Sequence, residues 1–112
     1  MRPTYHLAPV EVWAVASDAE LYAAPSLATE GFIHCTDGVT PLGVTFDRYY
    51  AADARPFLAL TVDLDAVAVP WRYDVPGSPY PHIYGPIARS AIIATDRVRR
   101  SPDGRFAGLD PA

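Results

Sequence analysis

The stretch PFLALTVDL (residues 56–64) is a nearly continuous run of apolar residues, interrupted only by Thr61 and Asp63. A strand with one face in water alternates apolar and polar side chains, whereas a strand covered on both faces reads as an almost unbroken hydrophobic run. We therefore predict that this segment forms a central β-strand buried on both faces.

The segment before this strand gives the clearest helix signal. Within residues 40–53, apolar side chains from Leu42 to Tyr50 recur at helical spacing. Pro41 suits a first helical turn, and Thr40 is predicted to cap the helix at its N-terminus.

Shorter elements are predicted on either side of this pair. Two further helices are predicted at residues 9–17 and 25–31. Ser26 is the predicted cap of the second helix, and Gly31 is its predicted end. Strands are predicted at residues 4–8, 32–36, 69–74, 82–85 and 89–98. The sequence thus predicts an α+β fold in one small domain spanning residues 1–112, with residues 99–112 as a solvated C-terminal tail.

Composition restricts the function. The 112-residue chain has a formal net charge of −4, which argues against non-specific binding to nucleic acid. No apolar run approaches the ~20 residues that span a bilayer, and the N-terminus lacks a signal-peptide pattern, so we expect a cytoplasmic protein without membrane contact. All nine basic residues are arginine, which excludes Schiff-base chemistry on an internal lysine.

The three histidines share a pattern. His6, His34 and His82 each lie in a predicted strand between mainly apolar neighbours, and successive strand residues point to opposite faces. If the neighbours face a core, each imidazole faces the other way. Three such strands would line one cleft for a flat, polar ligand, although three unrelated half-exposed histidines fit the same pattern.

Aromatic and hydroxyl side chains accompany the histidines on the same predicted faces. Phe32 and Thr36 accompany His34, and Tyr84 accompanies His82. Such side chains offer stacking and hydrogen bonds to a flat, polar small molecule.

Two other chemistries use the same residues. A nucleophilic Cys35 with His34 as its base is disfavoured, because adjacent strand residues point apart and Cys35 would face the core. A metal hydrolase built on the three histidines stays open as an alternative, although the sequence has no H-x-H or H-x-x-x-H spacing. A catalytic carboxylate would come from Glu30, Asp37 or Asp96.

Several motifs occur in an order that resembles a known family. These motifs are YH in the first strand, PSLATEGFIHCT, DRYY, LALTVD and PHIYGPI. Together, from about residue 5 to residue 98, they resemble the bacterial family catalogued as domain of unknown function 952. The sequence departs from the family pattern at Thr36, where serine is usual, and at Tyr73, where an acidic residue is usual.

The resemblance implies a fold and a ligand. The family is grouped with the ADP-ribosyltransferase-like superfamily, which implies a split β-sheet with two or three short helices and NAD as substrate. On this resemblance His6 would hydrogen-bond a ribose hydroxyl, and Arg48 would reach a phosphate. Phe32, His34 and Thr36 would line the nicotinamide pocket, and His82 and Tyr84 would flank the reacting ribose or the substrate.

The leading hypothesis is therefore a cleft that binds NAD or a related nucleotide, with ADP-ribosyl transfer or NAD glycohydrolysis as its reaction. The alternatives are a non-enzymatic module that binds a small metabolite and the histidine-based metal hydrolase.

Overall fold

The predicted buried strand lies inside a four-stranded antiparallel sheet, in the strand order β1-β4-β8-β9. The computed structural model describes residues 1–15 and 20–112. Its helices are α1 (Val10–Val15), α2 (Pro25–Glu30) and α3 (Val39–Tyr50), with 3₁₀ turns at Leu64–Ala66 and Arg89–Ala91. Its strands are β1 (Pro3–Pro9), β2 (Leu21–Tyr22), β3 (Ile33–His34), β4 (Phe57–Asp63), β5 (Trp71–Tyr73), β6 (Pro81–Ile83), β7 (Ile87–Ala88), β8 (Ile92–Arg100) and β9 (Phe106–Pro111). The predicted α+β class is confirmed.

Strand β4 is buried on both faces, as predicted. Leu58, Leu60 and Val62 face one hydrophobic core, while Phe57 and Ala59 face a second core. Successive side chains of a strand point to opposite faces of the sheet. A strand between two cores therefore needs apolar residues at odd and at even positions.

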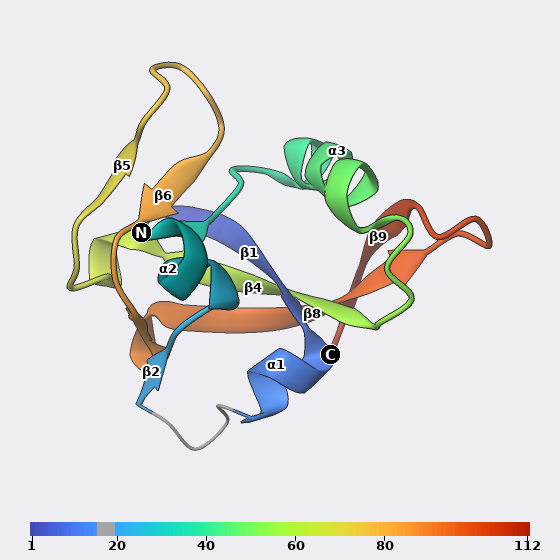
Figure 1. Cartoon of the computed structure of the whole chain (residues 1–112), viewed down its shortest axis with the longest axis horizontal. Coiled ribbons are helices and arrows are strands. Elements are labelled where there is room, and N and C mark those ends of the chain that lie inside the picture. Colours follow the sequence, from blue (N-terminus) through green and yellow to red (C-terminus); the bar gives the residue numbers. More distant parts are fainter. Residues whose placement is uncertain (16–19) are drawn as a thin grey trace.

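The two cores are closed by different elements. Helix α3 and β9 cover the Phe57 side with Leu42, Phe46, Phe106 and Leu109. Helices α1 and α2 and the small sheets β2-β7 and β3-β6-β5 cover the Leu58 side. In Figure 1, α3 accordingly lies on one side of the long strands, and α1 and β2 lie on the other.

Both predicted N-terminal helix caps are wrong. Helix α3 begins one residue earlier than expected, with Gly38 rather than Thr40 at the N-cap, and no side chain caps it. Helix α2 has Ala24 at its N-cap, and the Ser26 hydroxyl donates instead to the carbonyl of Phe32, at 2.8 Å. Ser26 is the second residue of α2, so its side chain is used for tertiary contact with the chain that leaves the helix.

The expectation of a solvated tail after residue 98 is also wrong. Residues up to Arg100 continue β8, and β9 pairs with it as an antiparallel hairpin. Arg100 donates to the carbonyls of Tyr50 and Ala51 at the end of α3, and Phe106 packs into the second core. Burial of the Phe106 ring and these hydrogen bonds hold the hairpin, despite its basic and turn-rich sequence.

The remaining predicted elements are present with different bounds, and most are shorter, although β1 extends the strand predicted at residues 4–8 by one residue at each end. Helix α1 ends at Val15, and the rest of predicted helix 9–17 lies outside the described residues. Residues 89–91 form a 3₁₀ turn instead of the start of β8. None of the helices in the described part of the chain has the length and apolar character that crossing a bilayer requires.

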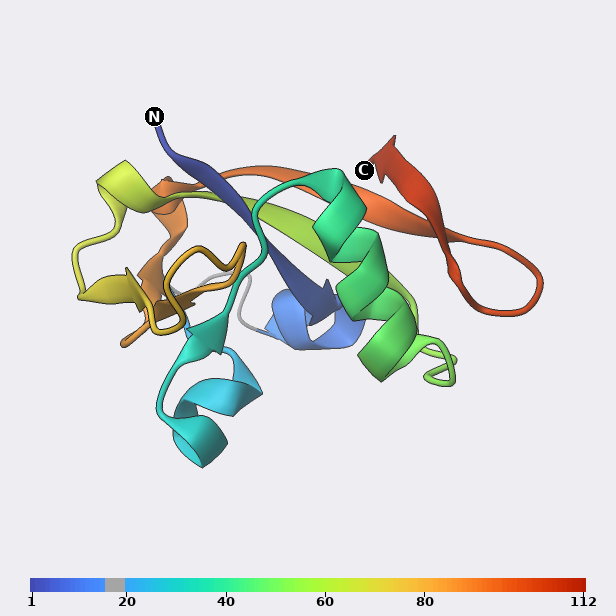
Figure 2. The same ribbon diagram turned by 90° about the horizontal axis from the view of Figure 1, so that it is seen from above.

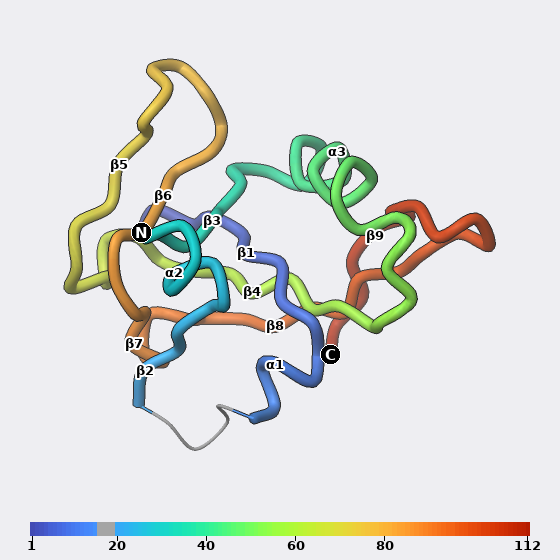
Figure 3. The backbone as a smooth tube through the Cα atoms, viewed as in Figure 1, coloured from blue at the N-terminus to red at the C-terminus, as the bar shows by residue number. Residues whose placement is uncertain are grey.

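Strand β3 connects the large and small sheets. It pairs with β6 on one side, and just beyond its end Thr36 forms an isolated bridge with Tyr5 of β1. Figure 3 shows β3 between β6 and β1, and Figure 2 shows the small sheet and α3 side by side along the long strands, with α3 nearer the C-terminal hairpin. The site described below lies along this division between α3 and the small sheet.

Candidate functional site

His34 and His82 are brought together by the register of β3 and β6, which pairs them directly. Their ring centroids are 5.5 Å apart, with the rings nearly perpendicular. Two residues 48 positions apart in the sequence therefore form one adjacent pair.

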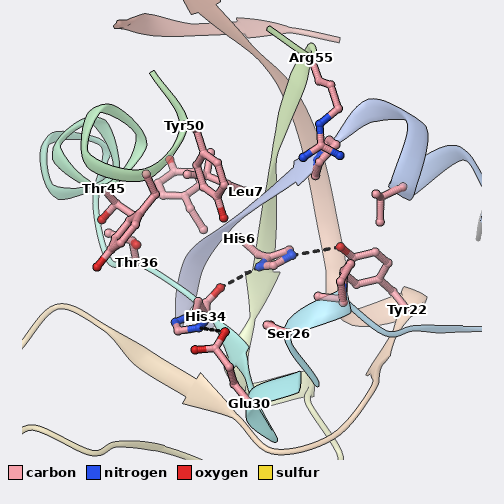
Figure 4. Close-up of a pocket in the computed structure, with 16 residues that line it drawn as sticks. His6, Leu7, Tyr22, Ser26, Glu30, His34, Thr36, Thr45, Tyr50 and Arg55 are labelled. Carbon is pink, nitrogen blue, oxygen red and sulfur yellow. Dashed lines mark hydrogen bonds and ion pairs between the residues drawn. The ribbon is translucent and has the colours of Figure 1, made fainter. Parts of the chain in front are cut away.

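His6 has a different environment, buried between β3 and β2. Its Nδ1 lies 2.7 Å from the carbonyl oxygen of His34, and its Nε2 lies 3.0 Å from the hydroxyl of Tyr22 (Figure 4). A carbonyl only accepts, so Nδ1 carries the proton and Nε2 accepts from Tyr22. Burial lowers the pKa of His6 to about 4 and raises that of Tyr22 to about 12.

The described contacts of His6 use both of its nitrogens. A direct hydrogen bond from His6 to a ligand would have to replace Tyr22 or the His34 carbonyl. In this structure His6 links the backbone of β3 to the side chain of Tyr22, and it positions His34 through that strand.

Two adjoining hollows flank His34. The first hollow has a volume of about 530 Å³ and is lined by His6, Tyr22, Glu30 and Arg55, among others. In Figure 4 Tyr50 and Thr45 approach it from the α3 side, and Glu30 approaches it from α2. A volume of this size suits a small organic ligand.

The second hollow has a volume of about 490 Å³ and includes His82, Arg48, Ser78 and Tyr80. The side chains common to both hollows are His34, Thr36, Thr45 and Tyr49. His34 thus lies where the two hollows meet, whereas His6 lines the first hollow and His82 lines the second.

The histidine pair is held by an aromatic ring and by carboxylates. Phe32 stacks on His82 with a centroid distance of 4.0 Å and an interplanar angle of 17°. Glu30 binds Nε2 of His34 at 3.0 Å. Phe32 is not among the described residues that line either hollow. It therefore supports His82 by stacking and does not line the cavity.

Sequence reasoning missed Asp74, which lies at the end of β5. Its Oδ2 accepts from Nδ1 of His82 at 2.6 Å and from the hydroxyl of Tyr84, and its Oδ1 accepts from Arg72 at 2.7 Å. Hydrogen bonds from Tyr84, Arg72 and His82 hold the pKa of the Asp74 carboxyl well below its usual range.

Tyr84 was a predicted ligand-binding residue, and the described contacts place its hydroxyl on Asp74. Alternation in residues 69–74 places Asp74 on the same face as Arg72, and Arg72 pairs with His82 across the hairpin. Only the β5–β6 register reveals this relation.

Two of the three candidate carboxylates lie elsewhere. Asp37 accepts from the hydroxyls of Thr4, at 2.7 Å, and Tyr73, at 2.5 Å. Asp96 is a β8 residue paired with Ala59 in the large sheet. Among the three, Glu30 is the carboxylate that lines a described hollow.

The environment of Cys35 agrees with a core position. Its side chain is buried, and burial raises the pKa of the thiol above its usual range. Within residues 1–15 and 20–112, no three His, Cys, Asp or Glu side chains are arranged to hold a metal ion. The geometry therefore offers the metal-hydrolase alternative no ligand set among these residues.

The fold and the site define a small α+β protein with a histidine-lined cleft between a helix and a small sheet. The family model described as "Protein of unknown function (DUF952)" matches residues 7–95, and the chain belongs to this family. No curated protein matched the sequence.

Solved structures of one other protein share the fold. The crystal structure of protein CC0527 from Caulobacter crescentus has a TM-score of 0.77 and 18% identity, over 94% of this chain and 93% of that chain. The solution NMR structure of CC0527 gives a TM-score of 0.71 and 19% identity, over 95% of this chain and 92% of the other.

Proposed function

We propose that this protein binds a nucleotide-like small molecule, with NAD as the first candidate, across the two hollows that meet at His34. The observation that carries the proposal is the sharing of His34, Thr36, Thr45 and Tyr49 by both hollows. A ligand with two linked parts would place one part in each hollow and would contact these side chains at its centre.

The chemistry of the shared side chains supports this class of ligand. The Tyr49 side chain is 68% exposed and offers a ring face for stacking. Thr36 and Thr45 offer hydroxyls for hydrogen bonds to polar groups such as ribose oxygens. Arg48 lines the second hollow and makes no ion pair within the described part of the chain, so its guanidinium is available to a phosphate.

Transfer or hydrolysis of the ADP-ribosyl unit is the reaction that this ligand suggests. The resemblance to the ADP-ribosyltransferase-like superfamily suggests this reaction by analogy of fold. The proposed reaction breaks the bond between nicotinamide and ribose.

A titration with NAD, followed by backbone amide NMR, tests the proposal. We expect saturable shifts centred on residues 34–36 and on α3. His34→Ala and Arg48→Gln should each weaken binding about tenfold or more, while the fold is retained because both side chains are exposed. Arg97→Gln, which removes another exposed arginine from β8, is the matched control and should bind like the wild type. No shifts at millimolar NAD, or shifts remote from His34, would contradict the proposal.

Binding without turnover is the second candidate function. The positions of the three candidate catalytic carboxylates favour it. Asp37 and Asp96 lie outside the described hollows, and the carboxylate of Glu30 is already hydrogen-bonded to His34. Chromatographic detection of nicotinamide distinguishes the two candidates. A binding module would bind NAD and leave it intact over hours.

A further inference from the structure

The His82–Asp74 pair carries an inference that rests on the proposed function and adds a chemical role to the second hollow. Nδ1 of His82 lies 2.6 Å from Oδ2 of Asp74. An ionised carboxylate only accepts hydrogen bonds, so the proton of a neutral His82 ring is on Nδ1. The lone pair of the neutral ring is therefore on Nε2.

The ring of His82 is fixed in orientation. Phe32 stacks on one face of the imidazole, and His34 lies nearly perpendicular to it. Asp74 is itself held by the hydroxyl of Tyr84 and by the guanidinium of Arg72. An imidazole positioned by a carboxylate in this way has a defined tautomer, as a general base requires.

The unprotonated nitrogen is available to a ligand. The side chain of His82 is 19% exposed and lines the second hollow. Among the described residues, Nε2 has no hydrogen-bond partner, although Nδ1 has one. A hydroxyl group bound in the second hollow would supply the missing donor.

The rim of the second hollow suits an organic hydroxyl compound. Val44, Tyr49, Val75 and Tyr80 line it and are among the most exposed large apolar side chains of the described chain. Burying such side chains favours a molecule with an apolar body. Water is the other source of the same hydroxyl chemistry.

We propose that His82 is a general base for a hydroxyl nucleophile bound in the second hollow, and that Asp74 is the residue that positions it. In the reaction with NAD, the hydroxyl oxygen forms a bond to the anomeric carbon of the ribose. The bond from that carbon to the nicotinamide nitrogen breaks, and nicotinamide leaves as a neutral molecule with the bonding electron pair. The hydroxyl proton passes to Nε2 of His82, while Nδ1–H keeps its proton and continues to donate a hydrogen bond to Asp74.

The tautomer of His82 is the first test, because it needs no ligand. Long-range ¹H–¹⁵N NMR on the ¹⁵N-labelled chain reports which ring nitrogen carries the proton at a pH where the ring is neutral. We expect the Nδ1–H form in the wild type and a mixture of tautomers in Asp74→Asn. An Nε2–H tautomer in the wild type would overturn the proposal, because that nitrogen could not accept a proton.

Nicotinamide release from NAD is the second test, run with and without 2-phenylethanol. We expect ADP-ribose from water, and the phenylethyl ADP-riboside when the alcohol is present. Asp74→Asn should lower kcat on the order of 10²-fold, while the dissociation constant for NAD from the NMR titration changes less than twofold. Asp74→Glu should recover part of the rate, and Asp65→Asn, an exposed carboxylate paired with the N-terminus, should act as the wild type.

The outcomes separate this inference from the proposed function. Binding of NAD without nicotinamide release, or equal rates in the wild type and Asp74→Asn, overturns the role of His82 and leaves the binding proposal standing. Absence of NAD binding overturns the binding proposal, and with it the inference.

Discussion

At the scale of single residues, His6 is the histidine whose chemistry the fold determines most strongly. Its imidazole is 6% exposed, and both of its nitrogens are hydrogen-bonded. Burial of the charged form costs free energy, and this keeps the ring neutral in the folded state.

We predict that the free energy of unfolding falls when the pH drops from about 6.5 to about 4. The pKa of His6 is lowered from 6.5 to about 4 on folding. Between these values the unfolded chain binds a proton that the folded chain does not, so the stabilisation is complete above 6.5 and is lost on the way to 4. The loss from this group is about 3 kcal/mol.

NMR titration of the His6 ring protons measures this pKa directly, and urea denaturation at several pH values measures the stability. A midpoint above 6 for His6 would contradict the prediction. His6→Gln, which has no titrating ring, should show a flatter dependence of stability on pH than the wild type.

We also predict that Cys35 reacts with a thiol reagent only when the chain unfolds. The side chain is 2% exposed, and burial disfavours the reactive thiolate. Ellman's reagent at pH 8 should give less than a tenth of the rate seen in 6 M guanidinium chloride. A fast reaction of the folded protein would show that Cys35 is accessible from the second hollow, which it borders.

At the scale of elements, helix α2 depends on the backbone conformation of the residue that caps its C-terminus. Gly31 caps it in the left-handed region, with φ of 87°, and an added Cβ would meet no atom within 4 Å. The cost of a side chain at this position is therefore conformational and not steric packing.

We predict that Gly31→Ala lowers the free energy of unfolding by about 1 kcal/mol, measured by urea denaturation. Gly31→Asn is the matched variant, and it should cost less because asparagine tolerates the left-handed region better. Equal stability of Gly31→Ala and the wild type would contradict the assigned conformation. Because Glu30 and Phe32 flank Gly31, the NMR signals of His34 should also shift in Gly31→Ala.

The ends of the helices show which features the local sequence predicts correctly and which it does not. Gly31 was predicted as the end of α2 because left-handed C-caps favour glycine. The caps assigned to Ser26 and Thr40 were wrong because a hydroxyl near a helix start is a statistical signal, and here the Ser26 hydroxyl has a tertiary partner in the carbonyl of Phe32. The sequence around a hydroxyl residue does not specify which backbone carbonyl outside the helix the fold will bring into hydrogen-bonding distance.

At the scale of the whole molecule, the C-terminal hairpin completes the second core. Phe106 packs near Phe46 of α3, and its amide donates to the carboxylate of Asp47 at 2.7 Å. Gly43 allows the close approach, because a Cβ there would lie 2.8 Å from the Phe106 ring.

We predict that Phe106→Ala lowers the free energy of unfolding by about 2 kcal/mol, below the range for a fully buried phenylalanine because the ring is half-buried. Ile93→Ala is the matched control. Ile93 lies on β8 and is 44% exposed, so its truncation should cost less than about 0.5 kcal/mol. Thermal and urea denaturation measure both. Equal effects of the two substitutions would contradict the closure of this core by the hairpin.

The sequence by itself determined those features that depend on near neighbours along the chain. The unbroken apolar run of β4 required burial on both faces, and alternation in FIHCT placed Cys35 in the core and His34 on the opposite side. The helical stripe of α3 included Leu42 and Phe46, which lie in the core, although Tyr49 of the same stripe is exposed. Periodicity of 2 or 3.6 residues is a property of the local backbone, so a single sequence carries it.

Only the tertiary structure decided which residues meet. The register of β3 with β6 paired His34 with His82, the packing of β2 against β1 buried His6 on Tyr22, and the β5–β6 hairpin brought Asp74 to His82. Such relations depend on strand register and on the sheet each strand joins. A shift of one residue in register would reverse which side chains face the cleft, and no local pattern specifies that choice.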